Sequence, residues 1–494
     1  MWQYNCKVTQ HGKRQLELDV TYPVTSDVPC ADYQLDLYIF SPAQLGLTES
    51  RYGVKRFLED INAYTRFSPP LIPLAKLLDP QCEISPLTRI HRILADLQPG
   101  EVVNKDKILY ELRMLANIYH DDLHTVQDNF KDSIGRGGDA NRLHERLQSF
   151  LKEMDAFMGS VRALRDIFIE KQIPEELCNA LLWADESISL RTEKEIYRLY
   201  AHFQERPDLA ASASALKGRL GKEHAYRVSV KYPSTIKEEK RIQNELFLYR
   251  ENTLKKWAQS ALYMSAAPSK TASRIAQLAA GFAAAVAMAF AVLTAILATN
   301  YYMIYSLPWV ILIVVAYIFK DRIKEMLRGV LMARIPRWIA DEHRWLIDRA
   351  VNQKVGFTRF RVRFLAPKDL AEPIVRKRDL QANPLRTILP PENVIHFHND
   401  MHLDCATLMK HHTRVESITG IMRLKLDSWL SNMDDPQDTL QYYSGEQMRE
   451  LQADRVYHVT LVLKLYKVSD PAEPALFKYR LILTRDGIIR IETV

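Results

Sequence analysis

The feature that most constrains this chain is a pair of uncharged runs near its middle. The first, Leu278 to Ala298, reads LAAGFAAAVAMAFAVLTAILA. As a helix it would be about 32 Å long, which matches the ~30 Å hydrocarbon core of a bilayer. The second, Tyr302 to Phe319, follows after three residues, and Pro308 either kinks it or marks a helix that begins near Trp309. The two runs predict two transmembrane helices joined as an antiparallel hairpin.

Basic residues flank this hairpin, whereas its connection carries no charge. They are Lys255, Lys256, Lys270 and Arg274 before it, and Lys320, Arg322, Lys324, Arg328, Arg334 and Arg337 after it. The positive-inside rule then places both termini in the cytoplasm, with Tyr301, Tyr302, Tyr305 and Trp309 as an aromatic belt at the far interface. The first residues, MWQYNCK, have no apolar signal region. We therefore expect a two-span protein of the inner membrane, with a bacterial origin favoured by this compact build.

Small residues follow a four-residue period along the first run. One row is Ala279, Ala283, Ala287, Ala291 and Ala295, and the row beside it is Gly281, Ala285 and Ala289. Such rows let helices approach closely in lipid, so this helix packs either on the second helix of the same chain or on a second copy in a homo-oligomer. No ionisable residue lies within either run, which argues against a transporter.

Hydropathy patterns divide the rest of the chain. Alternation predicts strands at Gln15–Tyr22, Tyr33–Phe40, Ala225–Tyr232 and Thr358–Leu365, and a final antiparallel meander from Val456 with a turn at Asp486-Gly487. Between the strands the pattern is helical, as in Lys105–Asp128 and Leu143–Lys171, in the order of an insertion between strands of one sheet. Because both ends are expected on one side of the membrane, the N- and C-terminal strands can share a sheet.

The expected fold is an α+β membrane protein, with the hairpin between two cytoplasmic domains: an N-terminal small sheet with a large helical region, and a C-terminal, mainly antiparallel β domain. The boundaries are 1–45 for the first strands, 46–224 for the helical region, 225–272 for a strand and an amphipathic helix that leads to the membrane, 273–320 for the hairpin, 321–352 for a basic amphipathic juxtamembrane helix, and 353–494 for the C-terminal β domain.

Charge and cysteine content exclude some classes of function. The net charge of +7 comes from 67 basic and 60 acidic residues spread along the chain, which is not the clustered footprint of a nucleic-acid-binding protein. The five cysteines are far apart: Cys6, Cys30, Cys82, Cys178 and Cys405. This spacing fits neither a disulfide framework nor a zinc ribbon. We therefore expect no cofactor unless histidines bind zinc or another divalent metal.

The densest histidine cluster is HFHNDMHLDC, residues 396–405. On a strand, His396, His398, Asp400 and His402 would share one face and offer imidazole and carboxylate ligands to a metal. The run resembles the H-x-H-x-D-H ligand motif of metallo-β-lactamase-fold hydrolases, but here the third histidine stands two residues after the aspartate. The alternative is a polar surface without metal.

A second cluster lies in the helical region. His91, followed by His120-Asp121, resembles the metal-binding layout of HD-type phosphohydrolases. The alternative is a solvated helix face, which often has the same composition.

Three functions therefore stay open. The first is a membrane-anchored, cytoplasm-facing interaction or regulatory protein, oligomeric and with an unknown protein partner. The second is a membrane-tethered metal-dependent hydrolase. The third is an oligomeric membrane-disrupting effector.

Overall fold

The structure is a computed structural model that describes residues 5–25, 27–97, 103–236, 241–269, 271–334, 340–378 and 391–494. The chain forms two compact units. One comprises Met1–Arg66, Met264–His411 and Ser417–Val494, and the other comprises Phe67–Tyr263 and His412–Glu416. Helix accounts for about 51% and strand for about 28%, so both are major components and the predicted mixed α+β class is confirmed.

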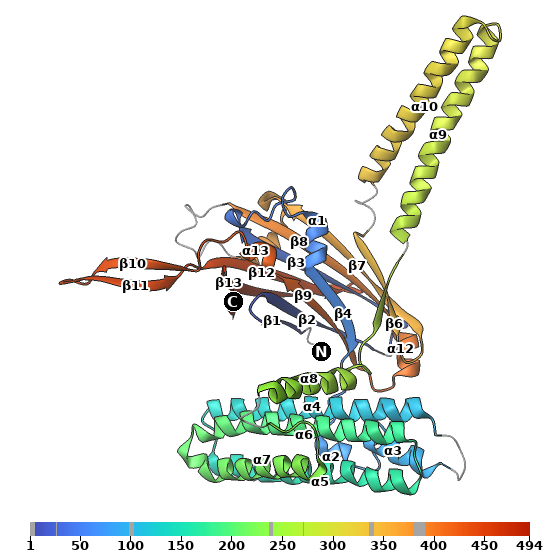
Figure 1. The fold of residues 1–494 in the computed structure, drawn as a ribbon. Helices are drawn as coiled ribbons and strands as arrows, with labels where there is room; N and C mark the ends of the chain where they lie inside the picture. The colour runs from blue at the N-terminus through green and yellow to red at the C-terminus, as the bar shows by residue number, and fades with distance from the viewer. Residues whose placement is uncertain are drawn as a thin grey trace. The chain divides into compact units, whose positions relative to one another are not determined.

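An eight-stranded antiparallel sheet is the frame of the first unit (Figure 1). Its strands, in spatial order, are β14 (Gly487–Thr493), β13 (Asp470–Thr484), β12 (Tyr457–Lys467), β3 (Cys30–Pro42), β8 (Glu392–Asp404), β7 (Gln353–Leu365), β6 (Glu342–Asp348) and β5 (Ser265–Pro268). Because β3 lies between β12 and β8, strands from both ends of the chain share one sheet. The strands predicted at 33–40 and 358–365 and the final meander are confirmed.

A four-stranded sheet lies against the inner face of the first sheet. Its order is β1 (Cys6–Gln10), β2 (Gln15–Pro23), β9 (Ser417–Lys425) and β4 (Ile61–Phe67). The strand predicted at 15–22 is thus confirmed, and Gly12 forms its turn with φ of +72°. Contacts across the two sheets include the Tyr22 ring, 5.4 Å from that of Tyr33, and a 3.4 Å hydrogen bond from Asn399 to the Tyr22 hydroxyl.

The two sheets form a sandwich. The first unit also contains short helices and a separate hairpin: α1 (Gly53–Asp60), α11 (Glu372–Arg378), α12 (Cys405–His411), α13 (Asp427–Leu430), and β10 (Gln437–Tyr443) paired with β11 (Met448–Asp454). Helix α11 covers one end of the outer face of the large sheet, where Ile374 packs with Phe40, Val394 and Val462. Beyond α11 that face carries polar and aromatic side chains, among them Tyr38 and Phe357.

A pair of long helices, α9 (Thr271–Tyr301) and α10 (Leu307–Arg334), is inserted between β5 and β6. The two lie side by side (Figure 1). Within the described residues, the segment Gln277–Tyr301 of α9 is the one helix long and apolar enough to cross a membrane. Helix α10 begins only at Leu307, so its uncharged part ends after about 20 Å at Phe319. The predicted two-span hairpin is therefore only partly supported, and the connection is 302–306 rather than 299–301.

One row of small residues on α9 is turned away from solvent. Ala283 and Ala287 are buried, and Ala279, Ala291 and Ala295 are half-buried. Gly281, Ala285 and Ala289 are exposed.

The second unit is helical. It contains α2 (Leu74–Leu77), α3 (Pro86–Ala95), α4 (Lys105–Gly135), α5 (Ala140–Glu170), α6 (Glu175–Gln204), α7 (Ala210–Val230) and α8 (Arg241–Gln259). Asn104 and Asp139 cap α4 and α5 by accepting hydrogen bonds from the Lys107 and Arg142 amides. The two helices predicted here are confirmed, and the unit interrupts the sandwich between β4 and β5.

Two predicted elements are wrong. Residues 225–232 are not a strand, because α7 continues to Val230 and buries Leu216, Arg219, Glu223 and Arg227 at helical spacing. The helix predicted over 321–352 ends at Arg334 as far as the structure describes it, and Glu342–Asp348 forms β6. There Trp345 lies opposite Phe357 of β7, so sheet pairing decides the conformation. The basic positions Lys270 and Arg337 lie outside the described residues.

Candidate functional site

The histidine cluster lies on the outer face of the large sheet. Along β8, Phe397, Met401 and Leu403 point into the sandwich and are buried. His396 and His398 alternate with them and are half-buried on the opposite face. The two-residue period of a strand therefore places the histidines together on one face, as the sequence predicted.

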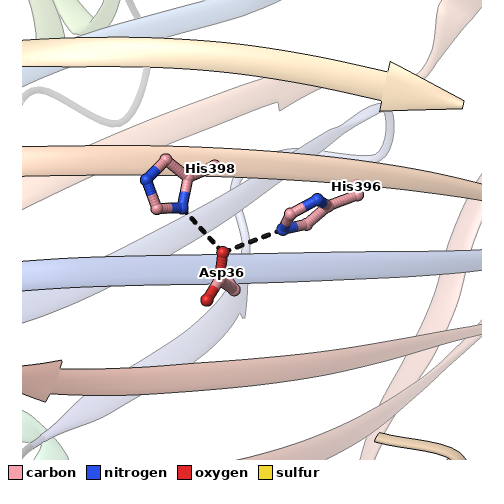
Figure 2. Close-up of side chains that lie close together, drawn as sticks. All are labelled: Asp36, His396 and His398. Atoms are coloured by element: carbon pink, nitrogen blue, oxygen red, sulfur yellow. Dashed lines mark hydrogen bonds and ion pairs between the residues drawn. The ribbon is translucent and has the colours of Figure 1, made fainter. Parts of the chain in front are cut away.

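Asp36 of the neighbouring strand β3 completes the cluster, and Figure 2 shows both imidazoles turned toward its carboxylate. Its Oδ1 lies 2.8 Å from His396 Nε2 and 2.7 Å from His398 Nδ1. In the sheet, Asp36 stands directly opposite His398, and His396 stacks on Tyr38 with the ring centroids 4.5 Å apart. Asp36 itself is only 7% exposed. The side chains are thus fixed by two central strands of the sheet.

His398 lies between two carboxylates. Its second nitrogen, Nε2, is 3.0 Å from Asp400 Oδ1, which also accepts a 2.8 Å hydrogen bond from Gln34. A carboxylate only accepts hydrogen bonds, so both ring nitrogens of His398 must carry protons. Burial lowers the pKa of His398, but the hydrogen bonds to Asp36 and Asp400 outweigh burial and raise it to about 9.

The pKa of Asp36 moves in the opposite direction. Burial alone would raise it, but hydrogen bonds from His396 and His398 and the charge of the imidazoles hold it well below its usual range. The cluster therefore pairs an ionised carboxylate with a protonated imidazole.

Cationic and aromatic side chains surround the cluster on the same face. Arg361 lies opposite His398 on β7, and its guanidinium is 3.5 Å from Asp400. Arg363 lies opposite His396, and Lys464 of β12 lies opposite Asp36. The Lys464 ammonium sits over the Tyr466 ring at 4.7 Å. This face is suited to binding anionic groups.

His402 does not join the cluster. It is 2.7 Å from Asp32 and stacks on Phe357 with the ring centroids 4.8 Å apart. The rise of about 3.3 Å per residue separates positions 396 and 402 by about 20 Å, so the predicted four residues cannot all ligate one ion. Sequence reasoning also missed Asp36, which is 360 residues from His396 and carries no local signal.

The second predicted cluster is not assembled. Within the described residues, Asp36, His396 and His398 are the one group of three potential metal ligands whose ligand atoms all lie within 4.8 Å of one another. His120 pairs with its neighbour Asp121 at 3.1 Å, and His91 instead lines a different cleft beside Thr88 and Arg92.

The helical unit has an apolar cleft of about 740 Å³. Trp183 and Trp257 meet edge to face at its wall, and Arg250, which is paired with Glu186, lies at its rim. Its volume is that of a small-molecule site, although Arg250, its charged lining residue, is already paired.

No protein-family model matches this sequence, and neither a curated protein nor a solved structure is significantly similar to it. Its function must therefore be argued from these residues alone.

Proposed function

We propose that this protein is a membrane-anchored, cytoplasm-facing interaction or regulatory protein, in which α9 and α10 form a two-span anchor. The observation that carries the proposal is the exposed apolar surface of α9. Phe282, Leu293 and Ile296 are 60%, 58% and 52% exposed although they lie in an uncharged 25-residue segment. A continuous surface of this kind is stable in lipid and promotes aggregation in water.

The ends of the helix pair have the composition of membrane interfaces. At the connection, Tyr301 and Tyr305 are exposed, and the Tyr305 ring meets that of Trp309 at 5.7 Å. At the other end, Lys320 limits the uncharged part of α10, and its long side chain can bring the ammonium to the lipid headgroups. Together with the five-residue connection, the uncharged part of α10 gives a run of 18 residues, 302–319, which is at the lower end of the length range of a span.

The row Gly281, Ala285 and Ala289 supports a homo-oligomer as part of this proposal. These residues are exposed, whereas Ala283 and Ala287 of the parallel row are buried and the other members of that row are half-buried. The exposed row leaves a close-packing surface for α9 of a second copy in lipid.

Carbonate extraction of membranes from cells that express the full chain tests the anchor. We expect the protein to stay in the pellet, and the double variant Met288→Arg/Val292→Arg to be released. Each arginine near the centre of a span costs about 2.5–3.5 kcal/mol of insertion free energy. The matched control is Leu440→Arg/Leu451→Arg on β10 and β11, where the side chains are 50% and 56% exposed, close to the 57% and 48% of Met288 and Val292, but lie outside the helix pair. Release of the unaltered protein by carbonate would refute the anchor.

The number of spans has its own test. Two spans place epitope tags at the N- and C-termini on the same side, so that external protease cleaves neither in intact spheroplasts. One span, formed by α9 alone, would expose one of the two tags. That result would refute the two-span anchor, and it would also contradict the pairing of β5 with β6, the strands on either side of the helix pair.

A further inference from the structure

We propose that Asp36, His396 and His398 bind a divalent transition-metal ion, and that Asp400 is a positioning residue for His398. This site is independent of the membrane anchor. It differs from the set His396, His398, Asp400 and His402 that the sequence indicates, because its carboxylate ligand comes from β3.

The first argument is convergence. His396 Nε2 and His398 Nδ1 approach the same oxygen of Asp36, at 2.8 and 2.7 Å, and all three ligand atoms lie within 4.8 Å of one another. A metal would replace the protons between these atoms, with ligand distances of about 2.0–2.2 Å. Only small rotations of the three side chains separate the hydrogen-bonded cluster from a coordinated one.

The second argument is the outer nitrogen of His398. A histidine that ligates a metal usually donates its other ring N–H to a carboxylate, which fixes the ring. Here Nε2 faces Asp400 Oδ1 at 3.0 Å. Asp400 is in turn held by Gln34 at 2.8 Å and by Arg361 at 3.5 Å. Asp400 is therefore itself held in the place that the outer carboxylate partner of a metal-binding histidine takes.

The third argument is rigidity and access. The ligands stand on β3 and β8, two hydrogen-bonded strands in the middle of an eight-stranded sheet. Stacking on Tyr38 fixes the His396 ring. The side chains of His396 and His398 are 18% and 15% exposed, so an ion can reach them although the carboxylate is largely buried.

The ligand set indicates the class of metal and of site. Two imidazoles and one carboxylate suit zinc and its neighbours in the first transition row. Three protein ligands leave a position open, as in catalytic rather than structural zinc sites. Since Arg363 and Lys464 share this face, an anionic oxygen ligand, such as a carboxylate or a phosphate, fits the open position.

The test is calorimetric titration of the full chain in detergent, stripped with a chelator, with Zn²⁺, and then absorption spectroscopy with Co²⁺. We expect one ion per chain. Removal of a ligand should weaken Zn²⁺ binding by more than about 100-fold, in each of the variants Asp36→Asn, His396→Gln and His398→Gln. Asp400→Asn should weaken it less, by the 10–100-fold typical of losing a residue that orients a metal ligand. Asp400→Asn should also alter the Co²⁺ d–d spectrum, because it frees the His398 ring.

The matched control is His402→Gln, which removes a histidine of the same strand and face that pairs with Asp32 instead. It should bind Zn²⁺ like the unaltered chain. Hydrogen exchange of β3 and β8 in each variant reports whether the sheet is intact. Two results would overturn the assignment. One is that the unaltered chain binds no Zn²⁺. The other is that the His402 variant loses as much Zn²⁺ affinity as the three ligand variants while the sheet stays intact.

Discussion

Glu223 of α7 is a buried acid of the helical unit with several charged partners. It is 1% exposed and accepts hydrogen bonds from Arg162 at 3.0 and 3.2 Å, from Arg219 at 2.8 Å and from Ser189 at 2.7 Å. The arginines come from α5 and α7 and the serine from α6, so one carboxylate joins three helices. The perturbation that isolates its charge is Glu223→Gln, which keeps the shape and one oxygen acceptor.

The magnitude follows from what the arginines retain. Breaking a buried ion pair typically costs about 3–5 kcal/mol, because the remaining charge is left unpaired. Here Arg162 still pairs with Asp185 at 3.2 Å, and Arg219 with Asp155 at 2.8 Å. The cost should therefore lie at the lower end, about 3 kcal/mol, or about a 100-fold change in an opening equilibrium.

Acidification should have the same effect. Burial raises the pKa of Glu223, but the hydrogen bond from Ser189 and the charges of Arg162 and Arg219 prevail and lower it. A carboxyl with a depressed folded-state pKa contributes stability at pH values above its ordinary pKa of 4.5, and the contribution is lost as the pH falls through the lower, folded-state pKa. The unaltered chain should thus lose protection in acid more steeply than the glutamine variant.

Hydrogen exchange of α6 and α7 in the detergent-solubilised full chain measures both effects. The control is Glu176→Gln, which removes a carboxylate 67% exposed and paired with Lys105 at 3.1 Å, and should cost less than about 1 kcal/mol. Equal protection in the Glu223 and Glu176 variants would refute the reasoning, since it would mean that the buried network contributes no more than a surface pair.

Three further predictions concern the first unit. Ala285→Leu should reduce the mass measured by light scattering in detergent to that of one chain. Ala287→Leu should leave this mass unchanged, because Ala287 is only 1% exposed, but it should destabilise the helix pair by about 1–3 kcal/mol. Gly487→Ala should expose β14 to hydrogen exchange, because φ is +143° and a Cβ would stand 2.1 Å from the Lys13 carbonyl oxygen. Zn²⁺ at 100 times its dissociation constant should stabilise β8 by about 2.7 kcal/mol, and Asp36→Asn should abolish the effect.

The strands were predictable where apolar and polar side chains alternate regularly along the sequence. The strands β2, β3, β7 and β12 each place apolar residues at every second position, and sequence analysis located all four. Helix α7 was mistaken for a strand at Ala225–Tyr232 because its buried side there is charged. Glu223 and Arg227 are interior residues held by ion pairs, and a hydropathy pattern cannot show that.

The candidate site was predictable only in part, for a related reason. His396 and His398 stand two residues apart, so a strand brings them to one face without further information. Their shared partner Asp36 is set by the register between β3 and β8, which no local pattern encodes. His402 satisfies the same alternation as the other histidines, and it is excluded only by the length of the strand between it and His396.

The site also depends on the order of the chain. Asp36 precedes both insertions, the helical unit and the helix pair, whereas His396 and His398 follow them. The ligands therefore meet only after β8 has paired with β3 of the N-terminal part. Metal affinity then reports whether β3 and β8 are paired, and we expect it not to depend on insertion of α9. A Met288→Arg/Val292→Arg chain that leaves the membrane but still binds one Zn²⁺ would show that the anchor and the metal site are separate properties of this protein.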